Sequence, residues 1–323
     1  MPELSHAEAL VEAIRECMDE DPNVALVWGS LMGVGGNNEH IEHIKSDFSD
    51  RIFHPPISEA AIAALATGAA MDGVRTIFPM GTASFMFRAW DQVIHEAGAA
   101  HYMSNGDVTV PAVFHVVHGL RGGGSVQHSQ SPQSMLWNSP GIEIAMPSCP
   151  ADAKGLMRTA IKSNNPTVFI DHQKLNRRRG EVPEGTYDIP FGVADVKREG
   201  KDITIVAVSL QVVHAIEAAE TLIEKGIDAE IVDLRSLVPL DEDAILSSVG
   251  KTGKLIVIDE GPPRCSIASE IVATVVEKGM SYLKVPPVRV NRLPVHVPAN
   301  VRLEEFIGPN TARIVEAAEA LCN

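Results

Sequence analysis

Strand-like apolar runs alternate with helix-like amphipathic segments along the whole chain, and this alternation predicts an α/β fold built from two parallel-sheet domains. The chain has 323 residues, more than one ordinary domain usually holds. Hydrophobic residues make up 45% of it and charged residues 21%, a composition that can bury cores and argues against disorder. Proline and glycine cluster without periodicity at residues 183–190, which indicates a linker. We therefore predict domains at 1–185 and 186–323.

The first domain is expected to open with a capped helix. Ser5 and Glu8 form a capping box ahead of an amphipathic helix, which Asp21-Pro22 ends. Ser58 can cap a second helix, from Glu59 to Met71, whose Ala and Gly content lets neighbouring backbones approach closely. The other elements expected before the linker are a helix at 85–100 and strands at 24–28, 75–78, 112–117 and 167–170.

Beyond the linker the same alternation restarts, which predicts a second parallel-sheet domain. The elements expected there are strands at 203–208, 229–232, 255–258 and 288–290, and helices at 212–224 and 267–278.

Charge and cysteine content exclude several classes of protein. The formal net charge is −15, and nucleic acid would be repelled by such a surface, so no nucleic-acid partner is expected. The N-terminus shows no signal-peptide pattern, and the small-apolar run at 60–71 is too short to span a bilayer, so no membrane partner is expected either. The four cysteines form no C-x-x-C pair, which fits a reducing compartment and predicts a cytoplasmic location.

The loop at residues 122–130 is the first candidate for a ligand site. It follows the strand at 112–117 and leads into a helix predicted to start at Ser131-Pro132, and α/β folds bind ligands at the carboxyl ends of parallel strands. His128 lies in this loop, and an imidazole there could carry protons. A bystander histidine on a flexible surface loop explains the pattern equally well.

Two other side chains suit a site but have commoner explanations. Glu59 opens the Ala- and Gly-rich helix, where an acid beside apolar neighbours could be functional, but the pattern alone favours plain capping of the helix dipole. Phe85 could stack on a planar ring, although core packing is the commoner role of such an aromatic side chain. The sequence contains no phosphate-binding loop and no G-x-S-x-G elbow.

Short motifs follow one another in a characteristic order along nearly the whole chain. They are Pro56-Ile57-Ser58-Glu59, residues 85–93, Gln127-His128-Ser129-Gln130-Ser131, Pro140-Gly141, residues 152–156, Asn164-Asn165-Pro166, Val182-Pro183-Glu184-Gly185 and residues 233–241. In order and spacing the motifs resemble the beta subunit of the thiamin-diphosphate-dependent first component of 2-oxo acid dehydrogenase complexes. Residues 102–104, 192–195 and 259–261 are closer to the acetoin dehydrogenase branch.

The resemblance implies a transketolase-like pyrimidine-binding domain, a transketolase C-terminal-like domain, and roles for four side chains. Glu59 would hydrogen-bond the aminopyrimidine ring of thiamin diphosphate, because a carboxylate can share a proton with a ring nitrogen. Phe85 would pack on that ring, and Ile57 would line its pocket. His128 would face a small-molecule substrate and stabilise the bound group or pass protons during acyl transfer.

The resemblance also implies partners and metals. The diphosphate and its magnesium would be held by an alpha subunit through a Gly-Asp-Gly motif, which this chain lacks, in a complex of two alpha and two beta chains. A lipoyl-bearing acyltransferase would accept the acyl unit. In some family members backbone carbonyls bind potassium, a hard cation suited to oxygen ligands; the matching positions are Ala112, Ala160, Ile161 and Asn165.

Two departures from the family pattern leave other functions open. Ser30 stands where the family has a glutamate near the cofactor, and His54 stands where it often has an aspartate. One alternative is a split transketolase-like enzyme that moves a two-carbon unit between sugars. Another is a non-catalytic scaffold subunit that kept the fold.

Overall fold

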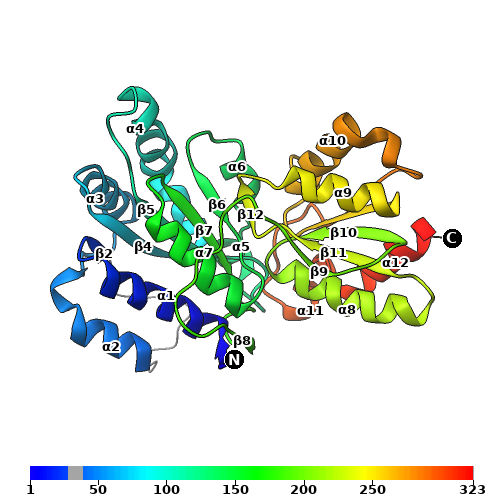
Figure 1. Ribbon diagram of the computed structural model, residues 1–323, viewed down its shortest axis with the longest axis horizontal. Coiled ribbons are helices and arrows are strands. Elements are labelled where there is room, and N and C mark those ends of the chain that lie inside the picture. The colour runs from blue at the N-terminus through cyan, green and yellow to red at the C-terminus, as the bar shows by residue number, and fades with distance from the viewer. Residues whose placement is uncertain (28–38, 323) are drawn as a thin grey trace.

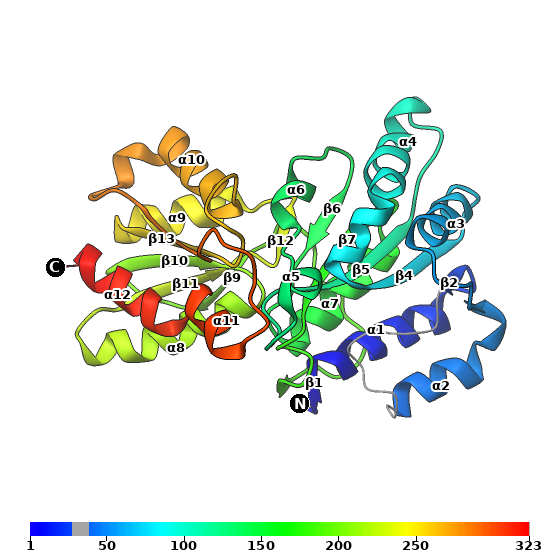
Figure 2. The same cartoon turned by 180° about the vertical axis from the view of Figure 1, so that it is seen from behind.

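The computed structural model describes residues 1–27 and 39–322 and shows two α/β halves side by side (Figure 1). Within these residues, the first half holds a seven-stranded sheet and the second a five-stranded sheet, and a two-stranded ribbon accompanies the first. Helices flank both sheets, as the view from behind also shows (Figure 2). The predicted fold of two mainly parallel α/β sheets is confirmed.

The first sheet has the strand order β12-β6-β7-β5-β4-β2-β3. All neighbours are parallel except β12, which pairs antiparallel with β6. The parallel strands therefore end at one common edge, where the loops that follow them gather. The bounds are β2 (Val24–Val27), β3 (Ile52–Phe53), β4 (Arg75–Thr82), β5 (Ala112–His118), β6 (Glu143–Ala145), β7 (Thr167–His172) and β12 (Ser236–Val238).

Alternate residues of this sheet face two different helical layers. Ile77 and Val113 share a buried cluster with the helices α1 and α7, whereas Phe78 and Phe114 share another with α3 and the helical segments after β4. The helical segments of this half are α1 (His6–Glu20), α2 (Glu39–Asp47), η1 (Ser49–Arg51), α3 (Glu59–Met71), η2 (Ala83–Ala89), η3 (Asp91–Ala97), α4 (Gly98–Met103), α5 (Ser125–His128), α6 (Gln133–Trp137) and α7 (Pro150–Lys162).

The second sheet has the order β14-β13-β10-β11-β9, parallel except for the edge strand β9. Its strands are β9 (Asp195–Arg198), β10 (Ile203–Ala207), β11 (Ala229–Asp233), β13 (Leu255–Asp259) and β14 (Val288–Asn291). Its helical segments are α8 (Leu210–Glu224), α9 (Glu242–Thr252), α10 (Ile267–Gly279), η4 (Met280–Tyr282), α11 (Val301–Ile307) and α12 (Thr311–Cys322). No helix of the described chain is long and apolar enough to cross a membrane.

The two halves are joined by more than the chain connection. After β11 the chain returns to the first sheet as β12, so a strand from the second half completes the first sheet. A single buried cluster contains Phe114 of the first sheet and Val206 and Val232 of the second. The boundary between residues 185 and 186 stays a prediction, because this shared core crosses it.

Local structure departs from the sequence-based expectation at several points. The helix expected at 85–100 is a succession of a 3₁₀ segment (η2), a π-helix (η3) and a short α-helix (α4). His128 ends the one-turn helix α5, so its placement in a plain loop is wrong. Helix α6 begins at Gln133 with Pro132 at the cap position, so the predicted start at Ser131-Pro132 is also shifted. The ribbon of β1 (Glu3–Ser5) and β8 (Arg179–Glu181) has no counterpart in the prediction.

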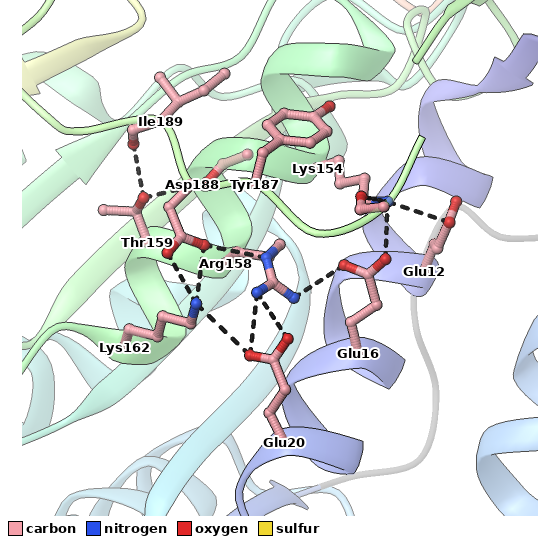
Figure 3. Close-up of polar contacts among 12 residues, drawn as sticks. Glu12, Glu16, Glu20, Lys154, Arg158, Thr159, Lys162, Tyr187, Asp188 and Ile189 are labelled. Carbon is pink, nitrogen blue, oxygen red and sulfur yellow. Dashed lines mark hydrogen bonds and ion pairs between the residues drawn. The ribbon is translucent and has the colours of Figure 1, made fainter. Parts of the chain in front are cut away.

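The predicted linker is docked on α7 (Figure 3). The Tyr187 hydroxyl donates to the Ala151 carbonyl at 2.8 Å, and the backbone N–H of Ile189 donates to the Gly155 carbonyl at 3.1 Å. A Cβ at Gly155 would lie 2.5 Å from the Ile189 side chain, so the close approach requires glycine. The Arg158 guanidinium, 2% exposed, binds Asp188 of the linker at 3.0 Å.

Candidate active site

All four side chains expected at the cofactor and substrate lie after strands that end at the common edge of the first sheet. Strands β4 and β5 are parallel neighbours paired from Thr76 opposite Ala112 to Thr82 opposite Val117, with a shift in register between Pro79 and Gly81. The segment after β4 carries Phe85, and the segment after β5 carries His128. Helix α3, which begins at Glu59, follows β3 and packs on β4 and η2.

Phe85 and His128 are in direct contact. Their ring centroids are 5.7 Å apart and their planes are nearly perpendicular, at 88°. The Ser84 hydroxyl donates to the Gln127 carbonyl beside them, which ties η2 to α5. Phe85 is half-buried and His128 is exposed, so the pair presents an aromatic edge and an imidazole to the outside. The adjacency of β4 and β5 thus brings together two residues that are 43 positions apart in the chain.

Glu59 and Ile57 lie at the start of α3. Glu59 is the first residue of the helix and is half-buried, where the helix dipole favours its negative charge. Ser58 holds the cap position, but its side chain makes no capping hydrogen bond. Ile57 is 74% exposed, which is unusual for a large aliphatic side chain beside a packed helix. An exposed apolar side chain, a carboxylate and an aromatic ring therefore come from neighbouring elements, a set that suits an apolar planar ring with hydrogen-bonding nitrogens.

A glycine-rich loop between β5 and α5 leads to His128. Gly119, Gly122 and Gly123 have φ angles of +92°, +88° and +98°, a backbone conformation that glycine adopts readily. Between them, the Arg121 guanidinium donates to Thr82 Oγ1 at 3.0 Å and to Gln173 Oε1 at 2.7 Å. Burial lowers the pKa of Arg121 despite the nearby negative charge of Glu304. Arg121 therefore links this loop to the ends of β4 and β7.

A buried histidine–carboxylate cluster, which the sequence-based prediction missed, lies directly beneath this loop. His172 Nε2 is 3.0 Å from Glu260 Oε2, and the rings of His118 and His172 meet edge to face at 4.9 Å. Burial and the neighbouring His172 lower the pKa of His118 to about 4. Burial alone would raise the pKa of Glu260, but His172 and His118 outweigh it and hold that pKa well below its usual range. The cluster joins the ends of β5 and β7 to the end of β13.

Three of the residues expected to bind potassium through their carbonyls lie at or just after the end of α7, and the fourth lies at the start of β5. Ala160 and Ile161 belong to the last turn of α7, and Asn165 lies in the segment that follows this helix. Ala112 is the first residue of β5. The Arg75 guanidinium donates to the Ile161 carbonyl at 3.1 Å and also to the carbonyls of residues 162 and 163.

The two departures from the family pattern have different positions. Ser30 lies outside the described residues. His54 is exposed and stands shortly before α3.

Comparison with known proteins identifies the family of this chain. Residues 3–178 match the family model of the transketolase pyrimidine-binding domain, and residues 192–314 match that of the transketolase C-terminal domain. The chain is 38% identical to the beta subunit of acetoin:2,6-dichlorophenolindophenol oxidoreductase from Cupriavidus necator, over 98% of this chain and 96% of that one. The chain belongs to the beta-subunit family of 2-oxo acid and acetoin dehydrogenases. The resemblance inferred from the motifs is thereby confirmed.

Other members of the beta-subunit family are similarly close. The Bacillus subtilis acetoin:2,6-dichlorophenolindophenol oxidoreductase subunit beta is 39% identical, covering 97% of this chain and 95% of that one. The 2-oxoisovalerate dehydrogenase subunit beta of the same organism is 38% identical, with 88% of each chain covered. A solved structure of a split-gene transketolase, an inactive beta4 tetramer, has a TM-score of 0.81 at 21% identity, covering 99% of this chain and 98% of that one. That structural similarity shows the shared fold.

Proposed function

We propose that this chain is the beta subunit of a thiamin-diphosphate-dependent 2-oxo acid or acetoin dehydrogenase, which cleaves a C–C bond next to a carbonyl group. The observation that carries the proposal is the edge-to-face contact of Phe85 and His128, in which Phe85 lies on the segment η2 that packs against α3, in a chain of this family. Phe85 is expected to pack on the cofactor and His128 to face the substrate, and the two side chains are in contact, as the proposed site requires.

The side chains of this site suit the aminopyrimidine ring of the cofactor. Glu59 offers a carboxylate oxygen that can share a proton with a ring nitrogen, while Phe85 and the exposed Ile57 offer apolar surface for the ring. Thiamin diphosphate, when bound, supplies the electron sink that C–C cleavage next to a carbonyl needs. His128, exposed beside Phe85, can hold or release a proton at a ring nitrogen that faces the substrate.

An alpha subunit is the proposed partner, because this chain presents an apolar surface where the cofactor would lie. The segment before α3 and the helices α3 and η2 carry exposed large hydrophobic side chains. These are Phe53, Ile57, Leu65, Met71 and Phe87. Such a surface fits a protein interface better than open water. We propose a complex of two alpha and two beta chains in which the alpha chain holds the diphosphate and magnesium.

Three finer features belong to the same proposal. A lipoyl-bearing acyltransferase would accept the acyl unit, and the four free cysteines support the cytoplasm as the compartment.

Potassium would be bound by the carbonyls of Ala112, Ala160, Ile161 and Asn165, beside the Arg75 guanidinium. If so, potassium should raise the unfolding temperature of the chain more than sodium at equal ionic strength, and equal effects of the two salts would exclude the site.

The activity is tested with the chain purified together with its alpha partner, thiamin diphosphate, magnesium and 2,6-dichlorophenolindophenol as electron acceptor. Reduction of the acceptor with acetoin or a 2-oxo acid is the expected result. Transfer of a two-carbon unit between sugars without an acceptor would favour a split transketolase instead. An intact complex that is silent with all of these substrates would favour a scaffold subunit.

A further inference from the structure

The loop that precedes His128 is held by a buried carboxylate from the second half of the molecule. Glu304 on α11 has an exposed fraction of 0%. Its Oε1 accepts the backbone N–H of Gly122 at 2.5 Å, and its Oε2 accepts that of Gly123 at 2.8 Å. Both carboxylate oxygens are thus directed at two consecutive backbone groups that lie more than 180 positions away in the chain.

Neighbouring contacts anchor both ends of the same segment. Glu260, which follows β13, accepts the backbone N–H of Leu120. Asp259, the last residue of β13, accepts the side-chain N–H of Gln133 at 2.9 Å. Residues 120–133 are therefore fixed before and after His128, while His128 itself is exposed.

The chemistry of the Glu304 contact indicates more than packing. A buried carboxylate carries a large desolvation cost unless hydrogen bonds compensate it, and an apolar side chain would fill the same space without that cost. Within the described residues, Glu304 forms no ion pair closer than 4.0 Å, so its hydrogen bonds to Gly122 and Gly123 are its main compensation. These glycines have φ angles of +88° and +98°, which glycine adopts readily, and their N–H groups bind one oxygen of the carboxylate each.

We propose that Glu304, assisted by Glu260, is a positioning residue that holds the glycine-rich loop so that His128 stays against Phe85. The proposal rests on the proposed function of His128 at the substrate. Arg121 lies in the same loop and binds Thr82, the residue before η2, at 3.0 Å. The loop is thereby held between α11 on one side and the segment that carries Phe85 on the other. The second half of the chain thus sets the geometry of a site built on the first.

Removing the Glu304 carboxylate should reduce turnover more than binding. In Glu304→Ala the N–H groups of Gly122 and Gly123 lose their acceptor, and a displacement of about 1 Å in a reacting group can cost roughly 10²-fold in rate. We expect kcat of the complex to fall about 10- to 100-fold, with the KM for substrate and the Kd for thiamin diphosphate within about twofold of the parent. Glu304→Gln keeps one oxygen acceptor, so its kcat should lie between those of the parent and of Glu304→Ala. Glu305→Ala, at the exposed neighbouring position of α11, is the matched control.

A double-variant cycle tests whether Glu304 acts through His128. If it does, Glu304→Ala combined with His128→Ala should be no slower than His128→Ala alone, because the loop then has no imidazole to position. Fully additive losses would show that Glu304 acts elsewhere and would overturn the proposal. Equal losses in Glu304→Ala and Glu305→Ala would do the same.

Hydrogen–deuterium exchange of the same complexes gives a measurement that does not depend on activity. Exchange should accelerate in peptides covering residues 119–133 of Glu304→Ala, and not in peptides of the second sheet. An unchanged loop, or faster exchange throughout the chain, would overturn the proposal. If the loop responds as expected but the parent complex is inactive with every substrate, the positioning contact stands and the proposed function fails.

Discussion

The position of Glu59 suits two roles, capping of α3 and the proposed contact with a cofactor ring. Ser58 makes no side-chain capping hydrogen bond, and Glu59 is the acidic residue in the first turn of α3. Glu59→Gln keeps the size and removes the ability to share a proton. We expect turnover of the complex to fall by about 10²–10⁴-fold, with little change in unfolding temperature, measured by acceptor reduction and thermal unfolding. Rates near those of the parent would show that Glu59 is only a helix cap.

Asp233 belongs to a second buried charge cluster between the two halves. Three carboxylates share the ammonium group of Lys197, which is 2.6 Å from Asp152, 2.7 Å from Asp195 and 3.7 Å from Asp233. Burial and the nearby negative charge of Asp152 raise the pKa of Asp233 to about 7, although Lys197 opposes the shift. The Ser148 hydroxyl donates to Asp233 at 2.5 Å. The proton is expected on Asp233, the carboxylate farthest from the lysine.

This raised pKa makes folding stability depend on pH. In the unfolded chain an aspartate titrates near ~3.9, so between about pH 4 and pH 7 the folded chain binds more protons than the unfolded one. The contribution of Asp233 to the free energy of unfolding therefore falls as the pH rises through this window. His118 has the opposite sign, because its pKa of about 4 means that stability is lost as the pH falls below ~6.5.

Asp233→Asn should remove the contribution of Asp233 to the pH dependence of folding stability and leave the contribution of His118. We expect the variant to gain stability relative to the parent as the pH rises from about 4 to 8, by a few degrees in unfolding temperature. Thermal unfolding of both proteins across this range measures the difference, which cancels the other titrating groups. A difference that does not vary with pH would show that Asp233 is ionised throughout.

Helices α1 and α7 pack through two complementary charged stripes (Figure 3). Acidic residues repeat every four positions along α1, and basic residues repeat every four positions along α7, so each stripe follows one helix face. The acidic residues are Glu12, Glu16 and Glu20, and the basic residues are Lys154, Arg158 and Lys162. Arg158 is the most connected member, because it contacts Glu16, Glu20 and Asp188 of the linker. The contact therefore fixes α1, α7 and the linker together.

Arg158 and Lys162 allow a matched test at this interface, since both contact Glu20 and Asp188. The Arg158 side chain is 2% exposed and that of Lys162 is 42% exposed. Arg158→Ala should lower the free energy of unfolding by ~2–3 kcal/mol, less than the ~3–5 kcal/mol of a fully buried pair because its acidic partners are partly exposed. Lys162→Ala should cost less than ~1 kcal/mol. Urea unfolding of the two variants checks the order, and equal losses would contradict it.

At the scale of the whole molecule, the sequence predicts what local chemistry determines. Helix α3 runs from Glu59 to Met71 as expected, and the capping box of Ser5 and Glu8 forms at the start of α1. The crossover of β12 to the first sheet and the contacts of Glu304 were not predictable, because they depend on pairing between distant segments. The sequence predicted Phe85 and His128 as separate residues of one site, but it did not predict their contact. Their meeting requires the β4–β5 register, which no local pattern encodes.

The distribution of the site over the molecule leads to the last prediction, that the isolated chain binds thiamin diphosphate poorly. Glu59, Phe85 and Ile57 suit the aminopyrimidine ring, but the sequence contains no Gly-Asp-Gly motif for the diphosphate and magnesium. The exposed side chains of Ile57 and Phe53 also fit a proposed ring-binding surface that a second chain covers.

Titration calorimetry should therefore show weak binding, with little dependence on magnesium, for the chain alone. The same chain purified with its alpha partner should bind the cofactor much more tightly and only with magnesium present, because the metal and the diphosphate share one set of ligands. Glu59→Gln in the complex is the control that separates loss of ring contact from loss of the diphosphate site. Tight, magnesium-dependent binding by the isolated chain would show that the whole cofactor site lies within it, and the division of the site between two subunits would then be wrong.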